Sequence, residues 1–479
     1  MSAPSLSLPT RPRPGFGRAL DTFHRAAIHV PAYADFLARR GIEPANIRTA
    51  DDFAALPPMT KAEYLRHYPL RMLLWHGDVA SAGTWSCSSG STGRPSYWPR
   101  DLVAQEEAIE LYSRVFRDSF QTRQRSTLLV VGFAMGNWIG GTYTYAAATA
   151  MRQRGHRIST IAPGIEPETI LADIAELGPH YDQVVLAGYP PFVKDVLDRA
   201  PAEVLRQNLR ILLAGEAITE EWRDYVLDRI GKPGQQGEIR VVYGTADAGI
   251  MGCETRTSVA VRRAAGADPA LSEALFGEAH LQPTFVEYDA EYRYTEVDAE
   301  GRFLFSADTA IPLLRYRIND VGRIFSAAEL AAVLDAHGHR LPVRTSTDSC
   351  GFLALHRRTD VAASFYALEI YPENIRAALE DPDVGPTVTG KFVLVTDTDA
   401  RFEQTLRLRV ELRDGVCPAG GFTALLERKV VDALLRTNSE YRRLHRALGS
   451  AAEPRISLHR HGSAGFETGV KHQWTGARS

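Results

Sequence analysis

Cysteine is scarce in this chain, and the few residues present are widely separated. Only four occur among 479 residues, and no two of them form a Cys-x-x-Cys pair. A disulfide framework needs more cysteines, and a cysteine-rich metal site needs closely spaced ones. The sequence therefore predicts a protein of a reducing compartment, and we expect a cytoplasmic location.

Long apolar runs are also missing. No stretch approaches the roughly 18 apolar residues that a membrane-crossing helix needs. The N-terminal residues 1–16 are rich in proline, serine and arginine and have no apolar centre, so we expect no signal peptide there. We interpret them as a flexible tail, and we expect no membrane partner.

An excess of charge of either sign is absent as well. Lysine and arginine total 55 and aspartate and glutamate 58, which gives a formal net charge of −3. Proteins that bind nucleic acid usually carry a basic surface, so this balance argues against a nucleic-acid partner. The length and a hydrophobic content of 44% are enough for a large core and two or more domains.

What the chain does contain is a regular alternation of apolar runs and amphipathic stretches. Short apolar runs predict buried strands, and the stretches between them predict helices, an order that favours an α/β domain with a largely parallel sheet. The predicted strands are Ser126–Val131, Gln183–Ala187, Ile211–Ala214 and Ile239–Val242. The predicted helices are Ala104–Phe116, Thr142–Arg154, Glu166–Glu176, Phe192–Arg199 and Thr219–Ile230.

The pattern changes twice towards the C-terminus. From Glu287 onwards strands alternate with turns, such as the turn at Asp298–Gly301. From about Asp360 a separate α+β module of about 120 residues is predicted, a typical domain size. Its expected elements are a helix at Pro372–Leu379, strands at Phe392–Thr396 and Thr405–Leu412, one helix over Phe422–Leu448 and a strand at Arg455–Leu458.

The loop Ser86–Pro95 has the most distinctive composition. Eight of its ten residues are serine, threonine, glycine or proline. Backbone N–H groups and hydroxyls at this density suit phosphate binding. The loop lacks the Gly-Lys-Ser/Thr ending of a Walker A motif. A flexible linker has a similar composition, so the loop alone leaves both interpretations open.

Five later segments carry residues that suit nucleotide chemistry. A carboxylate such as Asp247 is a hard ligand for Mg²⁺, and one such as Asp320 can accept two bonds from a vicinal diol. A flexible lysine such as Lys471 can stabilise a developing negative charge. Structural roles in the core, at a helix cap or on the surface remain the alternative for each. The segments are Leu213–Ala217, Val242–Asp247, Leu314–Gly322, Arg357–Asp360 and Phe466–His472.

In this order, the loop and the five segments resemble the adenylate-forming superfamily of acyl-CoA synthetases, adenylation domains and luciferases. Tyr243–Asp247 resembles the Tyr-Gly-x-Thr/Ser-Glu motif, with Ala246 in place of the hydroxyl residue and Asp247 in place of glutamate. Two N-terminal stretches, Val30–Tyr33 and Leu56–Lys61, are similar to the phenylacetate–CoA ligase branch. The resemblance covers nearly the whole chain.

The resemblance implies an α/β fold. It implies a large N-terminal adenylation domain with mixed and parallel sheets over residues 17–358, and a small mobile α+β C-terminal domain over residues 359–479. It also implies that ATP and Mg²⁺ activate a small carboxylic acid as an acyl-adenylate, which is transferred to coenzyme A. The alternative acceptors are an amine or a carrier-protein thiol. The monomer and the homodimer both remain open.

Individual roles follow from the same resemblance. The catalytic residues it implies are Lys471, Asp247 and Arg358, with Asp247 also the Mg²⁺ ligand and Asp360 the hinge between the two domains. The residues it implies for nucleotide binding are Ser88, Ser89, Gly90, Ser91, Thr92, Gly93, Gly215, Glu216, Ala217, Tyr243, Gly244, Thr245 and Asp320.

Two segments that combine aromatic residues with glycines are candidates for the acyl pocket, Phe133–Gly141 and Ala187–Pro191. Such residues can form a flat slot for an aryl or arylacetic acid, although they could equally belong to the core. The residues we select are Phe133, Asn137, Trp138, Gly141, Gly188 and Tyr189.

Three further patterns were weighed. Gly385–Lys391 satisfies Gly-x4-Gly-Lys, but Phe392 takes the place of the Ser or Thr, and the helix and strand flank it in the wrong order for a P-loop. Cys253 and His280 could join a metal site, yet no cysteine pair supports one, so we favour structural roles. Ala246 and Val361 depart from the superfamily motifs. A catalytically inactive relative that binds a nucleotide or an acyl ligand therefore remains an alternative interpretation.

Overall fold

The computed structural model describes residues 14–88, 96–277, 279, 282–358, 363–370, 372–379, 381–463 and 466. Two compact units make up the chain, and each combines three separate stretches of sequence. The first comprises Met1–Trp85, Pro99–Arg114 and Asp247–Arg358. The second comprises Ser86–Trp98, Val115–Ala246 and Thr359–Ser479. The division into domains at 358 and 359 stays a prediction.

The second unit contains five parallel strands in the order β7-β6-β5-β3-β4. Four of them were predicted, and β4 was missed because it is only four residues long and half-buried. The strands are β3 (Thr127–Gly132), β4 (Ile158–Ile161), β5 (Gln183–Gly188), β6 (Leu209–Ala214) and β7 (Ile239–Thr245). The helices between them confirm the predicted alternation: α6 (Ile139–Gln153), α7 (Pro167–Leu177), α8 (Pro190–Arg199), α9 (Ala202–Leu205) and α10 (Glu220–Arg229).

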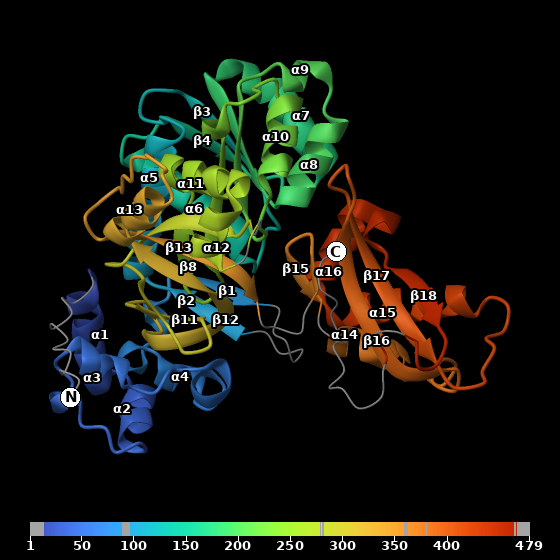
Figure 1. Ribbon diagram of the computed structural model, residues 1–479, viewed down its shortest axis with the longest axis horizontal. Coiled ribbons are helices and arrows are strands. Elements are labelled where there is room, and N and C mark those ends of the chain that lie inside the picture. The colour runs from blue at the N-terminus through green and yellow to red at the C-terminus, as the bar shows by residue number, and fades with distance from the viewer. Residues whose placement is uncertain are drawn as a thin grey trace. The chain divides into compact units, whose positions relative to one another are not determined.

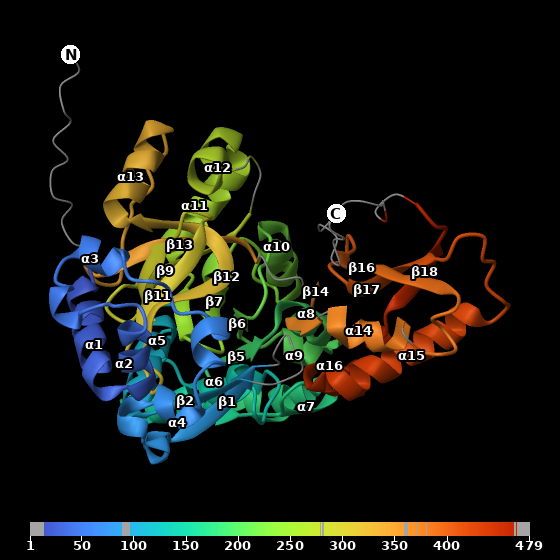
Figure 2. The same ribbon diagram turned by 90° about the horizontal axis from the view of Figure 1, so that it is seen from below.

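The C-terminal part of this unit contains three helices and a three-stranded sheet, and two of the helices pack against that sheet (Figure 2). The expected single helix over 422–448 is wrong, because Asn438 interrupts it. The Asn438 side chain accepts the N–H groups of Glu440 and Tyr441 and thereby starts a new helix. The elements are β14 (Ala363–Phe365), β15 (Leu368–Ile370), α14 (Pro372–Leu379), β16 (Val388–Thr398), β17 (Gln404–Leu412), α15 (Phe422–Thr437), α16 (Ser439–Leu448) and β18 (Arg455–His459).

The first unit contains six strands in the order β10-β11-β12-β13-β9-β8, and their described pairings are antiparallel. The turn predicted at Asp298–Gly301 joins β10 to β11, where Asp298 N–H donates to Arg302 O over 2.9 Å. The strands are β8 (Gly249–Cys253), β9 (Thr284–Asp289), β10 (Tyr294–Val297), β11 (Arg302–Ala307), β12 (Leu313–Ser326) and β13 (Cys350–Arg358).

Helices flank this antiparallel sheet, and α11, α12 and α13 share an apolar core with β9, β12 and β13 (Figure 1). The N-terminal helical stretch is broken at Val30, because the residue before a proline is driven out of the helical region. The helices are α1 (Phe16–His29), α2 (Pro31–Ala38), α3 (Ala50–Ala54), α4 (Leu70–Leu73), α5 (Leu102–Asp118), α11 (Arg256–Ala267), α12 (Pro269–Phe276) and α13 (Ala327–Ala336). Two further strands, β1 (Thr84–Ser88) and β2 (Ser96–Arg100), border the predicted phosphate loop.

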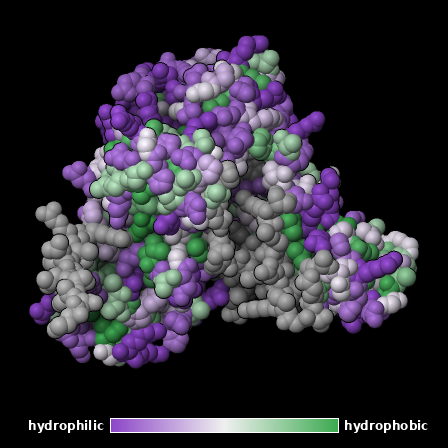
Figure 3. All heavy atoms as spheres, in the orientation of Figure 1, coloured by the Kyte–Doolittle hydropathy of each residue, from purple (hydrophilic) through white to green (hydrophobic). Residues whose placement is uncertain are grey.

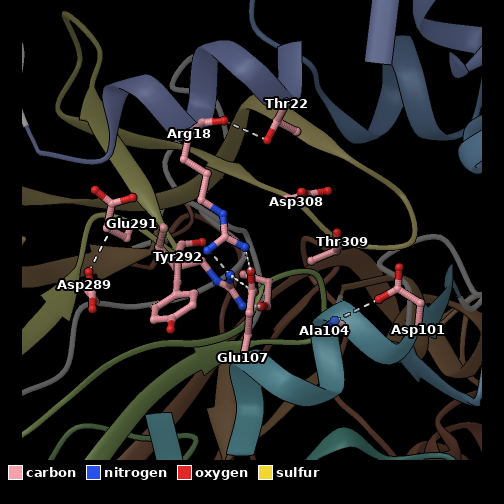
Figure 4. A network of polar contacts seen from close by, with 12 residues as sticks. Arg18, Thr22, Asp101, Ala104, Glu107, Asp289, Glu291, Tyr292, Asp308 and Thr309 are labelled. Atoms are coloured by element: carbon pink, nitrogen blue, oxygen red, sulfur yellow. Dashed lines mark hydrogen bonds and ion pairs between the residues drawn. The ribbon is translucent and has the colours of Figure 1, made fainter. Parts of the chain in front are cut away.

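A buried carboxylate ties several of these elements together (Figure 4). Glu107 of α5 is 3% exposed and accepts from Arg293 over 2.8 Å and from Arg18 of α1 over 2.6 Å. Burial raises the pKa of Glu107, although both arginines oppose that shift. The charges therefore compensate one another inside the first unit, and α1 is anchored to α5 through one side chain.

The surface in Figure 3 is mostly hydrophilic over α9 and α10, while hydrophobic residues form smaller groups elsewhere on that face. Within the described part of the chain, no helix combines the length and the apolar character needed to cross a bilayer.

Candidate active site

The carboxyl ends of the parallel strands bring several predicted site residues to one edge of the sheet. Gly188 ends β5, Gly215 follows β6, and Tyr243 lies near the end of β7. The strands β5 and β6 are paired in parallel, as are β6 and β7, so these ends are neighbours. Ligands of open parallel sheets bind outside the carboxyl ends of the strands. The fold therefore brings Gly188, Gly215 and Tyr243 to the edge of the sheet where ligands of such sheets bind.

Gly215 is required at its turn for two reasons. Its φ of +94° lies in the left-handed region that favours glycine. A Cβ at this position would also lie 2.7 Å from Ala367 Cβ and 3.0 Å from the ring of Tyr189. The adjacent Glu216 carboxylate accepts hydrogen bonds from Ser364, Ala367 and Gln404. The Glu216 side chain is thus engaged within the protein, and an adenine contact through the backbone stays a prediction.

A cavity in the second unit contains two of the predicted acyl-pocket residues, Trp138 and Tyr189. The ring of Phe133 packs edge-on against Tyr189 with centroids 5.1 Å apart. Burial raises the pKa of Tyr189, so its phenol stays neutral and the wall it forms is uncharged. The full lining is Ala134, Trp138, Ile165, Tyr189, Phe192, Tyr366, Ala367, Leu368, Glu440 and Leu444.

The other predicted pocket residues have structural contacts of their own. A Cβ on Gly141 would lie 2.6 Å from the carbonyl oxygen of Ala134, and one on Gly188 would lie 2.7 Å from Val193. Asn137 is exposed, and its carbonyl oxygen accepts the N–H of Cys87 over 2.8 Å. Close packing thus explains both glycines, and the acyl role of these three residues stays a prediction.

Asp247, the predicted Mg²⁺ ligand, is buried in the first unit and precedes β8 in the sequence. Its Oδ2 accepts the hydroxyl of Tyr316 over 2.7 Å, and its Oδ1 lies 3.9 Å from Nζ of Lys61. The backbone oxygen of Asp247 accepts from the Arg100 guanidinium over 3.4 Å. The hydroxyl of Tyr316 therefore orients the carboxylate, and Lys61 places a positive charge beside it.

The side chains around Asp247 can bind Mg²⁺ only if a substrate supplies further oxygen ligands. Among the described residues, no three His, Cys, Asp or Glu side chains are grouped closely enough to hold a metal ion by themselves. Mg²⁺ commonly takes one or two carboxylates and completes its coordination with phosphate oxygens and water. The single carboxylate of Asp247 matches that pattern.

Two residues predicted to contact the nucleotide are neighbours in the antiparallel sheet. Asp320 of β12 is 3% exposed and lies directly opposite Arg358, at the end of β13. The two positions are distant in the sequence, so only the strand pairing brings their backbones together. The roles of Asp320 and Arg358 in binding ATP stay predictions.

Comparison with known proteins gives evidence on the fold. No protein-family model matches the chain, and no curated protein matches it by sequence. Solved structures do match. A 2-hydroxyisobutyryl-CoA ligase in complex with 2-HIB-AMP and CoA, in the thioesterification state, is 14% identical with a TM-score of 0.64, over 96% of this chain and 88% of that one. In the postadenylation state with R3-HIB-AMP, that ligase is 14% identical with a TM-score of 0.52, over 96% and 87% of the chains.

The chain shares the fold of this CoA ligase. This confirms the predicted α/β fold class, and membership of the adenylate-forming superfamily stays a prediction. The closer similarity to the phenylacetate–CoA ligase branch stays a prediction, because the matched structures show the fold alone.

Several residues implied for an adenylate-forming site fall outside the described part of the chain. They are Ser89, Gly90, Ser91, Thr92 and Gly93 of the phosphate loop, Asp360 of the hinge, and Lys471. The side chains of Ser88 and Arg358 belong with them. His280 is also outside, whereas Cys253 is described, and burial raises the pKa of its thiol.

Neither Tyr316 nor Lys61 was among the predicted site residues, although both belong to segments that carry the resemblance. Residues 314, 316, 318 and 320 are all buried, in alternation with less buried neighbours, which places Tyr316 on the same face as Asp320. That alternation could have identified Tyr316. Lys61 could not be found this way, because a β-bridge between Met59 and Tyr316 brings its segment to the site.

Proposed function

We propose that this protein is an ATP-dependent, AMP-forming ligase that activates a carboxylic acid and transfers the acyl group to the thiol of coenzyme A. The supporting observation is the buried pair of Asp247 and Tyr316 with the partly exposed Lys61 beside it, which occurs in a fold shared with a CoA ligase. The predicted Tyr-Gly-Thr-Ala-Asp motif ends at this Asp247, directly after the strand end that carries Tyr243.

In the first step, an oxygen of the substrate carboxylate attacks the α-phosphorus of ATP. The bond from that phosphorus to the bridging oxygen of the β-phosphate breaks, and pyrophosphate leaves with the bonding electrons. Lys471 stabilises the charge that develops around the transferred phosphorus. Tyr243 and the Gly215 turn hold the adenine, and Asp320 accepts the ribose hydroxyls.

The Asp247 carboxylate would hold Mg²⁺, which would neutralise charge on the phosphates. Tyr316 keeps the carboxylate in place by donating to Oδ2, and this leaves Oδ1 available. Lys61, at 3.9 Å from Oδ1, adds positive charge for the same phosphates.

In the second step, the thiol sulfur attacks the acyl carbon and loses its proton, and AMP leaves with the carboxylate oxygen. An amine or a carrier-protein thiol would attack the same carbon. The aromatic wall of Trp138, Tyr189 and Phe192 favours an aryl or arylacetic acid, since flat rings pack well on such side chains.

The test is a panel of carboxylic acids, scored by acid-dependent pyrophosphate exchange and by AMP release with CoA, with amines or with a phosphopantetheinyl carrier protein. We expect exchange with at least one aryl acid, and AMP release that depends on CoA. AMP release that depends on an amine or on the carrier protein would change the proposed acceptor and leave the proposed first step unchanged.

Lys471→Ala should lower exchange about a hundredfold or more, in line with the loss of a charged group at the reacting centre. Lys429→Ala is the matched control, because Lys429 pairs with Asp381 over 2.8 Å on the surface of the same C-terminal segment. No exchange with any acid would identify an inactive relative and overturn the proposal.

A further inference from the structure

A two-residue turn at Tyr366 and Ala367 joins β14 to β15. Phe365 and Leu368 are the last paired residues of the hairpin, and both turn residues have positive φ, 48° and 61°. Turns of this kind usually contain asparagine and glycine, because other side chains strain the left-handed region. The strand pairing does not use the two N–H groups of the turn, so they need partners from elsewhere.

Two linked side chains accept these N–H groups. Tyr366 N–H donates to Gln404 Oε1 over 2.8 Å, and Ala367 N–H donates to Oε1 of Glu216. Gln404 Nε2 then donates to Oε2 of Glu216 over 2.7 Å. Ser364 completes the group by donating its hydroxyl to Glu216 over 3.2 Å. Amide and carboxylate thus form one connected clamp around the turn.

A second contact holds the same turn to α8. The hydroxyl of Tyr366 donates to Asp195 over 2.6 Å, and the Tyr366 side chain is 5% exposed. The buried Lys194, next to Asp195, lies 2.7 Å from Asp198 and 4.0 Å from Glu403. Carboxylates of the 115–246 stretch therefore bind the C-terminal stretch. Gly215 has no Cβ, which lets the two stretches approach each other closely.

We propose that Glu216 and Gln404 form a latch that positions the C-terminal stretch during the reaction. This inference rests on the proposed function and on the mobile C-terminal domain that the resemblance implies, which would take one position for adenylation and another for acyl transfer. Glu216 directly follows Gly215, whose turn is predicted to meet the adenine. The latch holds the described position, so weakening it favours one half-reaction at the expense of the other. Glu216 is then a positioning residue and makes no contact with the reacting atoms.

The hydrogen-bond pattern predicts a specific rescue. In Glu216→Gln two amide groups face each other, and in Gln404→Glu two carboxylates do, so each single variant breaks the pair. In the double variant, the new amide at position 216 can donate to the new carboxylate at position 404 and still accept from Ala367. The carboxylate at position 404 in turn accepts from Tyr366. All the bonds of the latch are thereby restored with donor and acceptor exchanged. Glu203→Gln, which changes an exposed carboxylate of α9, is the matched control.

Hydrogen exchange of the 363–370 segment tests the latch without any need for activity. We expect exchange about tenfold faster in each single variant, and wild-type exchange in the double variant and in the control. Single variants that match the control, or a double variant that is worse than both, would overturn the latch.

The two half-reactions test its role in positioning. Pyrophosphate exchange reports the first, and thioester formation from added acyl-adenylate reports the second. We expect each single variant to change the two rates in opposite directions, with the double variant close to wild type. A parallel loss of both rates would show a merely structural role. If the wild type has neither activity, the proposed function fails while hydrogen exchange still decides whether the latch exists.

Discussion

One hydroxyl group determines how the Asp247 carboxylate is presented. Tyr316 is 1% exposed, packs edge-on against Phe305 at 5.5 Å and donates to Oδ2 of Asp247. A side chain that is held so firmly can fix its partner without touching a substrate. The role of Tyr316 follows from the strand face on which it lies, and a sequence motif alone does not identify that role.

We expect Tyr316→Phe to lower the kcat of pyrophosphate exchange about tenfold, with little change in KM for the acid. A hydrogen bond to a charged group contributes roughly 1.5–3 kcal/mol, and about 1.4 kcal/mol corresponds to a factor of ten in rate. Steady-state exchange kinetics measure both constants. Tyr68→Phe is the control, since Tyr68 donates to Asp35 over 2.8 Å and has no predicted role in the site. An equal loss in both variants would refute the positioning role.

At the scale of single elements, the helix α6 depends on a glycine. A Cβ on Gly141 would lie 2.6 Å from the carbonyl oxygen of Ala134 and 2.6 Å from the sulfur of Met135, so the helix sits tightly against the loop before it. From the sequence, Gly141 was a candidate residue of the acyl pocket. The described contacts supply a packing reason that holds whether or not a substrate binds nearby.

Gly141→Ala should therefore reduce the free energy of unfolding by about 1–3 kcal/mol, because overpacking outweighs the better helix propensity of alanine. Gly266→Ala in α11 should instead raise it by about 0.5–1 kcal/mol, because a Cβ there has no atom within 4 Å. Urea unfolding measures both variants. If both changes have the same sign, the packing argument is wrong.

The contact between α1 and α5 depends on the Glu107 carboxylate. We expect Glu107→Ala to lower the free energy of unfolding by about 3–5 kcal/mol, because it leaves the buried Arg293 guanidinium without its carboxylate partner. Asp21→Ala, which breaks an exposed pair with Arg25, should cost about 0.5 kcal/mol or less. Denaturant unfolding compares the two, and a similar loss in both would contradict the importance of burial.

At the scale of the whole molecule, the pKa values of individual carboxyl groups are shifted in opposite directions, and these shifts make stability depend on pH. Burial raises the pKa of Glu287 above its ordinary value of 4.5. A hydrogen bond with His339 lowers the pKa of Asp268 below its ordinary value of 3.8. Glu287 thus contributes stability below pH 4.5 that is lost as pH rises through its folded pKa. Asp268 contributes stability above pH 3.8 that is lost as pH falls through its folded pKa.

These signs give a paired prediction. As pH rises above 4.5, Glu287→Gln should gain stability relative to the wild type, because glutamine has no buried charge to form. As pH falls below 3.8, the deficit of Asp268→Asn should shrink, because the wild type loses its ion pair with His339. Unfolding curves at a series of pH values measure both differences. Slopes of the same sign would overturn the assignment.

The fold was more predictable than the site. Strands such as β5 and β6 are short apolar runs bounded by amphipathic helices, and local pattern is sufficient to find them. The break at Asn438 was missed because a capping side chain interrupts an otherwise continuous helical pattern. Glu216 was predicted to bind nucleotide because it follows a strand. The residues that its carboxylate binds, however, lie more than 140 residues further along the chain.

By itself, the sequence determined the alternation of elements, the α/β fold class and the order of its motifs, because these depend on neighbouring residues. Only the tertiary structure decided that Tyr316 and Lys61 flank Asp247, that Asp320 lies opposite Arg358, and that Glu216 binds the Tyr366–Ala367 turn. The physical reason is that hydrogen bonds and ion pairs act over a few ångströms. Strand register and side-chain packing choose their partners, and neither can be read from local pattern.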